Sequence, residues 1–571
     1  MNMKKIYRLG ILAATCFAVT ACEFLDVEPQ IIPSDEFYKT EKEVAYGLAG
    51  VYGALNNEEL YGNYYSLMIS NTDDLCYQNR EHNGAYVYWY NHNSSDPYVY
   101  SAWTMLYAGI KNANEFMQAL TSPQFDKELD KDGRNYAEAR FLRAYYHFLL
   151  AQAWGNVPLR TKPTLTPDDV HLAATPQTDV LKWCVSEMEE AWKSFDDKLD
   201  NAPSRISKRT IEGILARVYL FTAGATVKGV DSKAMYERAA YWAGQVVADG
   251  RVKLNPSYAQ VFINMISDAY DRSSNESMWE AEFLGDRTNA QMWSNGRIGD
   301  MIGLQSTSGD NKYNEWNCNY SYAMYNGSLK LWDLYYTYDR TPEETENKAK
   351  LDARQEWNMP PYNYAGRKDN ATGLYIFRPS VDKTPYNYDK ISSFDDPSAA
   401  VGARNAGKWR REAVYEGHKI AKQLYTSINF PILRYSDVLL MYAEAVNESK
   451  GAPTQEAYDC VKRVRDRAGI QTVDFGAVGS YKEFQNFVRN ERGRELAFEG
   501  LRKWDLIRWG IFVEAMNGYA KLATDKRWSK DANTSRRATE TGTSVQARHI
   551  YLPIPSTELG VNKLLKQNPL W

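Results

Sequence analysis

The chain has 571 residues and a formal net charge of −4 at pH 7. Nucleic acid is disfavoured as a partner, because phosphate binding requires a basic surface that this composition does not supply. The cysteines beyond Cys22 (Cys76, Cys184, Cys318 and Cys460) form no CxxC pair and have no histidine at ligand spacing. We therefore expect no structural zinc and predict no disulfide.

The first 22 residues have the features of a lipoprotein signal. Lys4, Lys5 and Arg8 precede an apolar run over 9–19, which is too short to remain as a membrane span. Small residues then lead to Cys22, whose thiol can carry a diacylglycerol thioether. We expect residues 1–21 to be removed, which takes the net charge from −4 to −7, and Cys22 to anchor the chain through lipid. The alternative is a plain secretory signal with a chance cysteine.

Helical periodicity is clear in four places. Apolar residues recur at helical spacing over 136–153, over 210–222 with a further helical run at 233–248, over 432–447, and from 481 through 498 towards 509. Small residues between the aromatic ones suit close helix packing. This pattern predicts a mainly α fold with degenerate tetratricopeptide-like helix pairs as scaffold, although no strict 34-residue repeat is present.

The stretch 251–426 is different in composition. It is rich in Asn, Asp, Gly, Pro and Tyr and has little periodicity, which indicates long loops packed on the helices, where function usually lies. The length would allow three or four domains, but no Gly/Ser- or Pro-rich linker divides the chain. We therefore expect one body over 22–571, with an N-terminal helical part (22–250), a loop-rich ligand-side region (251–426) and a C-terminal helical part (427–571).

Several short motifs along the chain resemble those of one protein family. They are CEFLDVEPQ at 22–30, AEARFLRAYY at 137–146 with WGNVPL at 154–159, LRYSDVLLMYAEA at 433–445, RNERGRELAFEGLR at 489–502, WDLIRWG at 504–510, LPIP at 552–555 and QNPLW at 567–571. The sequence is similar to SusD/RagB-family outer-membrane nutrient-binding lipoproteins over essentially the whole mature chain. These motifs belong to the family scaffold and do not identify a ligand.

The resemblance implies a lipid-anchored protein at the cell exterior of a Bacteroidota-type outer membrane. Such proteins capture an oligosaccharide or polysaccharide and deliver it to a SusC-like TonB-dependent transporter. The membrane would be contacted through the lipid anchor only. No cofactor is expected, and a structural calcium ion is left open. The alternative within the same architecture is peptide capture, as in the RagB branch.

Two aromatic clusters supply the evidence for a sugar ligand. Eight rings lie between Tyr77 and Trp103, and nine between Tyr313 and Tyr338, mixed with polar residues. A pyranose face packs on aromatic rings while its hydroxyls need fixed polar partners. The candidate ligand-binding residues are Asp73, Arg80, Trp89, Tyr90 and Asn91 in the early segment and Trp293, Trp316 and Tyr320 in the centre. A helical scaffold without a small ligand would instead bury both clusters.

An enzyme would need catalytic groups, and the best pair is Glu491 with Glu495, which share one face of a helix. Two carboxylates at suitable separation could serve a glycosidase. A general acid, however, needs a raised pKa, and the neighbouring arginines, among them Arg492 and Arg494, favour the charged form. We therefore predict a buried ion-pair network and a protein that is not an enzyme.

Overall fold

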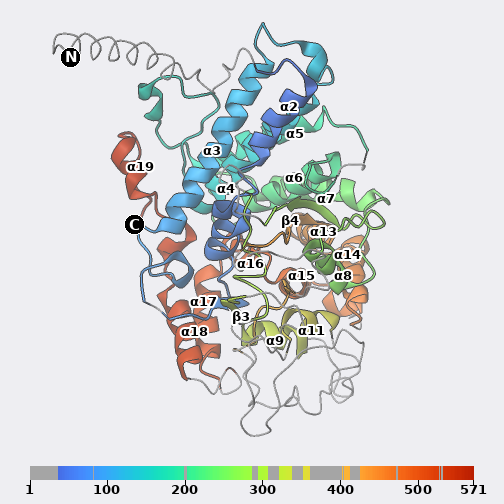
Figure 1. Ribbon diagram of the computed structural model, residues 1–571. Coiled ribbons are helices and arrows are strands. Elements are labelled where there is room, and N and C mark those ends of the chain that lie inside the picture. Colours follow the sequence, from blue (N-terminus) through green and yellow to red (C-terminus); the bar gives the residue numbers. More distant parts are fainter. Residues whose placement is uncertain are drawn as a thin grey trace, which may run out of the picture.

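The computed structural model describes residues 37–81, 83–198, 202–285, 294–305, 321–336, 352–360, 402, 404–411, 425–470, 474–525, 528 and 532–571. Helices dominate this part of the chain (Figure 1). Those of the first half are α2 (Glu41–Tyr52), α3 (Pro97–Leu120), α4 (Arg134–Trp154), α5 (Gln177–Trp192), α6 (Lys208–Thr222), α7 (Ser232–Ala248) and α8 (Tyr258–Ile266).

The second half of the chain adds mostly shorter helices. The helices are α9 (Leu329–Tyr336), α11 (Ala353–Asn358), α13 (Tyr435–Lys450), α14 (Gln455–Arg467), α15 (Tyr481–Leu496), α16 (Arg502–Arg508), α17 (Phe512–Leu522), α18 (Ala532–Ser544) and α19 (Ser556–Val561). Short helical turns occur at η1 (Glu58–Gly62), η2 (Tyr64–Ile69), η3 (Val87–Trp89), η4 (Lys127–Asp130), η5 (Pro167–Val170), η10 (Phe475–Val478) and η11 (Ala547–Ile550).

The helices predicted at 136–153, 210–222 and 233–248 are confirmed as α4, α6 and α7. Helix α4 ends at Gly155, whose φ of 75° is accessible to glycine without steric cost and whose N–H donates to the Ala151 carbonyl. Helix α6 begins at Ser207, whose hydroxyl accepts a hydrogen bond from the Thr210 N–H. Local sequence signals therefore set these boundaries.

The other two predicted helices needed correction at their ends. The helix predicted from 432 begins at Tyr435, because Phe430–Arg434 forms strand β4 and pairs antiparallel with β2 (Ser277–Ala281). The helix predicted from 481 towards 509 ends at Leu496, since Phe498 and Gly500 adopt positive φ before α16 begins. A distant strand caused the first error, and a left-handed turn caused the second.

Consecutive helices pack against one another through α3, α4, α5, α6 and α7. Helix α7 then packs on α13, and α13 packs on α14 and α15 (Figure 1). Helix α7 and helix α13 thus join the N-terminal and C-terminal helical parts directly. Among the described residues, no helix is long and apolar enough to cross a membrane.

The stretch expected as long loops contains regular elements where it is described. Helices α8, α9 and α11 lie in it, so the expectation of loops was wrong for these segments. Strand β3 (Tyr325–Gly327) pairs antiparallel with β1 (Cys76–Gln78), and β2 pairs with β4. The two small sheets attach this stretch to the early segment and to the start of α13, and thereby position the candidate site.

Candidate functional site

Trp89 and Tyr90, predicted to face a ligand, are buried. Trp89 is only 2% exposed, and its ring lies 4.8 Å from that of Tyr88 and 5.6 Å from that of Tyr86, with edge-on geometry in both pairs. Tyr90 adopts a left-handed conformation with φ 56°, and its hydroxyl donates to the Thr72 carbonyl. Neither side chain is therefore placed to contact a ligand at the protein surface; both pack beneath neighbouring residues.

Three half-buried tyrosines lie next to one another near Trp89, and we call them the tyrosine surface: Tyr64, Tyr86 and Tyr98. Of these, Tyr86 has its ring against Trp89. The rings of Tyr64 and Tyr98 lie 4.9 Å apart, edge to face, and those of Tyr86 and Tyr98 lie 5.8 Å apart. Aromatic pairs at these separations are mutually stabilising. The cluster is therefore an ordered group of rings, each with part of its area accessible.

Asp96 holds two elements of the tyrosine surface together. One carboxylate oxygen accepts from the N–H groups of Tyr98 and Val99 at the start of α3, and the other accepts from the Val87 N–H at 2.8 Å. Burial raises the pKa of Asp96 to about 6, although these N–H groups oppose the shift. The cap fixes α3 relative to η3 and hence Tyr98 relative to Tyr86.

Polar side chains border the tyrosine surface. Asn91, one of the predicted residues, is exposed; its amide oxygen accepts from the Tyr86 N–H at 2.9 Å and its amide nitrogen donates to the Gly84 carbonyl at 3.0 Å. Arg297 is paired with Asp300 at 2.6 Å and lies 3.9 Å from Glu58. Glu58 and Arg297 are both close enough to Tyr64 to act on its pKa, so amide, guanidinium and carboxylate groups lie near the rings.

Arg80, also predicted, joins this border through Tyr322. Its guanidinium lies 5.8 Å from the centre of the Tyr322 ring and donates to the Tyr322 carbonyl. The Tyr322 N–H donates in turn to Asp300 at 3.3 Å, and Asp300 is the ion-pair partner of Arg297. The early segment and the middle of the chain therefore meet at one place.

Asp73 and Asp74 are buried and order the early turn. Asp73 accepts from the N–H groups of Leu75 at 2.8 Å and Cys76 at 3.0 Å, while Asp74 pairs with Arg502 at 2.8 Å and also with Lys330. Burial, together with the charge of Asp74, raises the pKa of Asp73 to about 7. The position of Asp73 favours the ordering role over contact with a ligand hydroxyl.

The predicted central residues Trp293, Trp316 and Tyr320 lie outside the described residues. Other rings of the central cluster can be placed. Tyr325 and Tyr335 are buried, and Trp332 is buried beneath the Arg404 guanidinium at 4.4 Å. These three rings belong to the scaffold.

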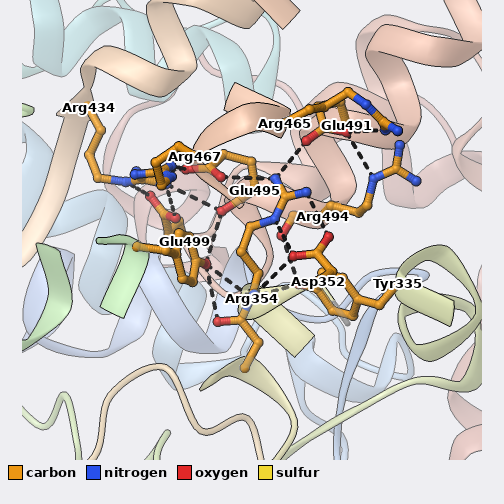
Figure 2. A network of polar contacts seen from close by, with 12 residues as sticks. Tyr335, Asp352, Arg354, Arg434, Arg465, Arg467, Glu491, Arg494, Glu495 and Glu499 are labelled. Carbon is orange, nitrogen blue, oxygen red and sulfur yellow. Dashed lines mark hydrogen bonds and ion pairs between the residues drawn. The ribbon is translucent and has the colours of Figure 1, made fainter. Parts of the chain in front are cut away.

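Glu491 and Glu495 form part of a buried ion-pair network, as predicted. Figure 2 shows their carboxylates directed towards the guanidinium of Arg354, at 2.7 Å and 3.1 Å respectively. Glu495 also pairs with Arg434 at 3.0 Å and with Arg467 at 2.6 Å. Four elements contribute to the network: α11, β4, α14 and α15.

The network keeps both carboxylates ionised. Burial alone would raise the pKa of Glu491, but the neighbouring arginines, Arg354 foremost, outweigh it and lower the pKa to about 2. The pKa of Glu495 is lowered in the same way by Arg467, Arg434 and Arg354. Neither group holds a proton to donate near neutral pH, which rules out the general-acid role.

The depressed pKa of Glu491 predicts a loss of stability in acid. The unfolded chain takes up a proton at Glu491 near pH 4.5, whereas the folded chain does so only near pH 2. The stabilisation is therefore complete above pH 4.5 and disappears as the pH falls towards 2, by on the order of 3 kcal/mol from this group. Urea unfolding measured across this range checks the prediction, which a flat profile would contradict.

Two sequence models match this chain. Residues 275–571 match the model described as "SusD family", and residues 23–220 match a model described as "Starch-binding associating with outer membrane". The chain belongs to the SusD family. The resemblance seen in the motifs is thus confirmed, and the family is associated with the outer membrane.

SusD-family relatives extend over nearly the whole chain. SusD-like protein P25 of Formosa agariphila is 24% identical, covering 100% of this chain and 98% of its own. The starch-binding protein SusD of Bacteroides thetaiotaomicron is 22% identical over 76% of this chain and 72% of its own. A SusD homologue from Bacteroides thetaiotaomicron has a similar structure, with a TM-score of 0.78, 24% identity and coverage of 94% and 98%.

Two further solved structures share the SusD-like fold and have a named glycan. One is a laminarin-binding SusD-like protein, with a TM-score of 0.64, 20% identity and coverage of 94% of this chain and 100% of its own. The other was solved with xylogluco-oligosaccharide, with a TM-score of 0.62, 17% identity and coverage of 91% and 97%. The mainly α, SusD-like fold expected from the sequence is confirmed.

SusD-like family members are carbohydrate-binding, non-catalytic proteins, in agreement with the prediction that this chain is not an enzyme. Among the residues that the structure describes, no group of three or more His, Cys, Asp or Glu side chains is arranged to hold a metal ion. Cys76, Cys184 and Cys460 are buried free thiols.

Sequence reasoning missed Tyr64, Arg297 and Glu58 of this SusD-family site. Tyr64 stands beside Tyr65 in η2, and only Tyr65 is buried, a difference that spacing does not reveal. Arg297 lies in the stretch 251–426, whose sequence has little periodicity from which to predict its position. One available signal was the density of tyrosine just before the early segment, from Tyr61 to Tyr65.

Proposed function

We propose that this chain is a lipid-anchored glycan-binding protein of the outer membrane, tethered through Cys22. It captures an oligosaccharide or polysaccharide at the cell exterior and delivers it to a SusC-like TonB-dependent transporter. The observation that carries the proposal is the tyrosine surface, where Tyr64, Tyr86 and Tyr98 expose part of their rings beside amide, guanidinium and carboxylate groups.

The chemistry of this surface suits a sugar. The C–H groups of a pyranose pack on accessible aromatic area, and its hydroxyls exchange hydrogen bonds with fixed polar groups. Asn91 and Arg297 are both held by neighbours, so a ligand meets groups that are already oriented. Preorganisation of this kind reduces the entropic cost of binding.

Relatives with named ligands support the class of ligand. Starch, laminarin and xylogluco-oligosaccharide occur among them, all of which are carbohydrates. These glycans differ from one another, so the proposal extends to a glycan and not to one particular sugar. Trp293, Trp316 and Tyr320 remain proposed contributors from the central region.

Substitution of the tyrosine surface provides the test. We expect Tyr86→Ala and Tyr98→Ala each to weaken glycan binding about tenfold, because each removes one stacking ring. The measurement is affinity electrophoresis of the chain in gels containing starch, laminarin or xyloglucan. Retardation by one glycan in the unchanged chain, reduced in both variants, is the expected result.

Tyr241→Ala is the matched control, because Tyr241 is 48% exposed on α7, away from the tyrosine surface. It should migrate like the unchanged chain. Equal retardation of all variants would place the glycan elsewhere on the molecule. If the folded chain is not retarded by any glycan but binds a peptide library, the peptide alternative replaces the proposal.

A further inference from the structure

Residues 559–571 expose three large apolar side chains and two lysines. Leu564 is 55% exposed and Leu570 is 71% exposed, and Val561 is exposed to a similar extent. Lys563 and Lys566 are also exposed, and the stretch contains no aspartate or glutamate. Its start, the end of α19, lies at the edge of the molecule (Figure 1). Apolar area and positive charge therefore coincide at one surface.

Leu570 is held outward by a strained backbone. Its φ of 74° lies in the left-handed region, which is costly for a residue with a Cβ atom. Tyr90 and Phe498 share this conformation, but their rings are buried, and the packing compensates the strain. Leu570 has the same backbone strain, but its apolar side chain is exposed to solvent and gains no stabilisation from burial.

Hydrogen bonds fix this conformation. The Trp571 indole N–H is shared between the carbonyls of Arg548 at 3.1 Å and Tyr551 at 2.9 Å. The Asn568 amide donates to the carbonyls of Trp154 and Leu552, both at 2.7 Å. Leu570, between these two anchors, is part of an ordered surface.

The beginning of the stretch is fixed as well. The Ser556 N–H donates to the Ser94 carbonyl, and the Asn562 amide donates to the Leu172 carbonyl, both at 2.8 Å. The segment is therefore attached to the loop before α3 and to the loop after η5. It moves with the body of the molecule, so any contact that it makes would orient the whole protein.

We propose that this segment contacts the surface of an anionic lipid bilayer. Leu564 and Leu570 enter the headgroup region, while Lys563 and Lys566 lie against lipid phosphates. Charge complementarity favours this occupant, since two exposed lysines lie among exposed apolar side chains and residues 559–571 contain no acidic side chain. The inference goes beyond glycan capture and rests on the proposed outer-membrane location; it adds a second membrane contact to the lipid anchor, which is the one contact implied by the family resemblance.

This contact would act together with the lipid on Cys22. An acyl anchor holds a protein near a membrane without fixing its orientation, and a second membrane signal strengthens attachment. The segment supplies that second signal. It lies outside the tyrosine surface, so the two proposals can fail independently.

The test is co-sedimentation with vesicles, using the chain from residue 22 with Cys22→Ser so that no lipid is attached. We expect binding to vesicles of phosphatidylcholine with phosphatidylglycerol, and much weaker binding to phosphatidylcholine alone. Replacing both Lys563 and Lys566 by glutamine should weaken binding roughly 30-fold, about fivefold for each lysine near the anionic surface.

Leu570→Gly separates binding from folding. Glycine adopts the left-handed conformation without strain, so this variant should unfold at the same or higher urea concentration while losing vesicle binding. Leu564→Ser should also lose binding, and Leu284→Ser, which alters another exposed leucine, should keep it. The proposal is overturned if the unchanged chain binds neither vesicle, or if Leu570→Gly and the double lysine variant bind like it.

Discussion

We expect Glu495→Gln to lower the free energy of unfolding by roughly 3–5 kcal/mol, the cost of breaking a buried ion pair by removal of one partner. Glu495 contacts Arg354, Arg434 and Arg467, whose side chains are at most 4% exposed. Glutamine keeps the shape of the side chain but removes the charge. The three guanidinium groups would then be less fully compensated in a buried region.

The loss of stability in Glu495→Gln should affect several segments that are distant in the sequence. Arg354 belongs to α11, Arg434 to β4 and Arg467 to α14, so Glu495 on α15 joins parts of the chain that the sequence separates widely (Figure 2). Urea unfolding followed by tryptophan fluorescence measures the effect. If Glu495→Gln unfolds at the same urea concentration as the unchanged chain, the network does not stabilise the fold.

Glu540→Gln is the matched control. Glu540 forms an ion pair with Arg536 at 3.0 Å on α18, and both side chains are more than 40% exposed. Exposed pairs of this kind contribute about 1 kcal/mol or less, because water and salt screen the charges. The same chemical change should therefore have little effect there.

The second large effect is expected for Trp89→Ala, which should destabilise the protein by roughly 3–5 kcal/mol through the cavity that it leaves. Trp89 lies beneath Tyr86 and Tyr88 with almost no exposed area. Its removal also withdraws the support on which Tyr86 rests. Glycan binding should therefore weaken as a consequence of lost order, together with lower thermal stability.

Two measurements distinguish this supporting role of Trp89 from direct contact between Trp89 and the ligand. Thermal unfolding should show the lower stability of Trp89→Ala, whereas Tyr98→Ala should lose binding with a much smaller change, since part of the Tyr98 ring is accessible. A Trp89→Ala variant with unchanged stability and no glycan binding would contradict the buried role. Such a result would restore Trp89 as a ligand-contacting ring.

Much of the helical scaffold was predictable from local pattern. The cores of α4, α6, α7 and α15 have apolar residues at helical spacing, and Ser207 and Gly155 mark boundaries by their own chemistry. These helix positions and boundaries depend on residues close together in the chain. The ionised state of Glu491 and Glu495 was also predicted, but the local arginines account for it only in part. Arg494 pairs with Glu491, whereas Arg354, Arg434 and Arg467 reach the two carboxylates from distant segments.

The candidate site was predicted less well, since spacing does not tell which of several adjacent rings is buried. Trp89 and Tyr90 were chosen as ligand-facing, yet the structure buries them and leaves Tyr86 and Tyr98 partly accessible. All four stand within the 13 residues 86–98, of which Tyr98 belongs to the first turn of α3. Their roles follow from the turn at η3 and the cap formed by Asp96.

The sequence by itself determined the family and the mainly helical scaffold, because both are encoded in short motifs or local spacing. Only the tertiary structure decided that residues 430–434 form a strand, that Trp89 supports the tyrosine surface, and that Arg297 and Arg80 meet through Asp300 and Tyr322. The physical reason is that pairing with a distant strand, burial of a ring and ion pairs across the chain depend on segments that only folding brings together.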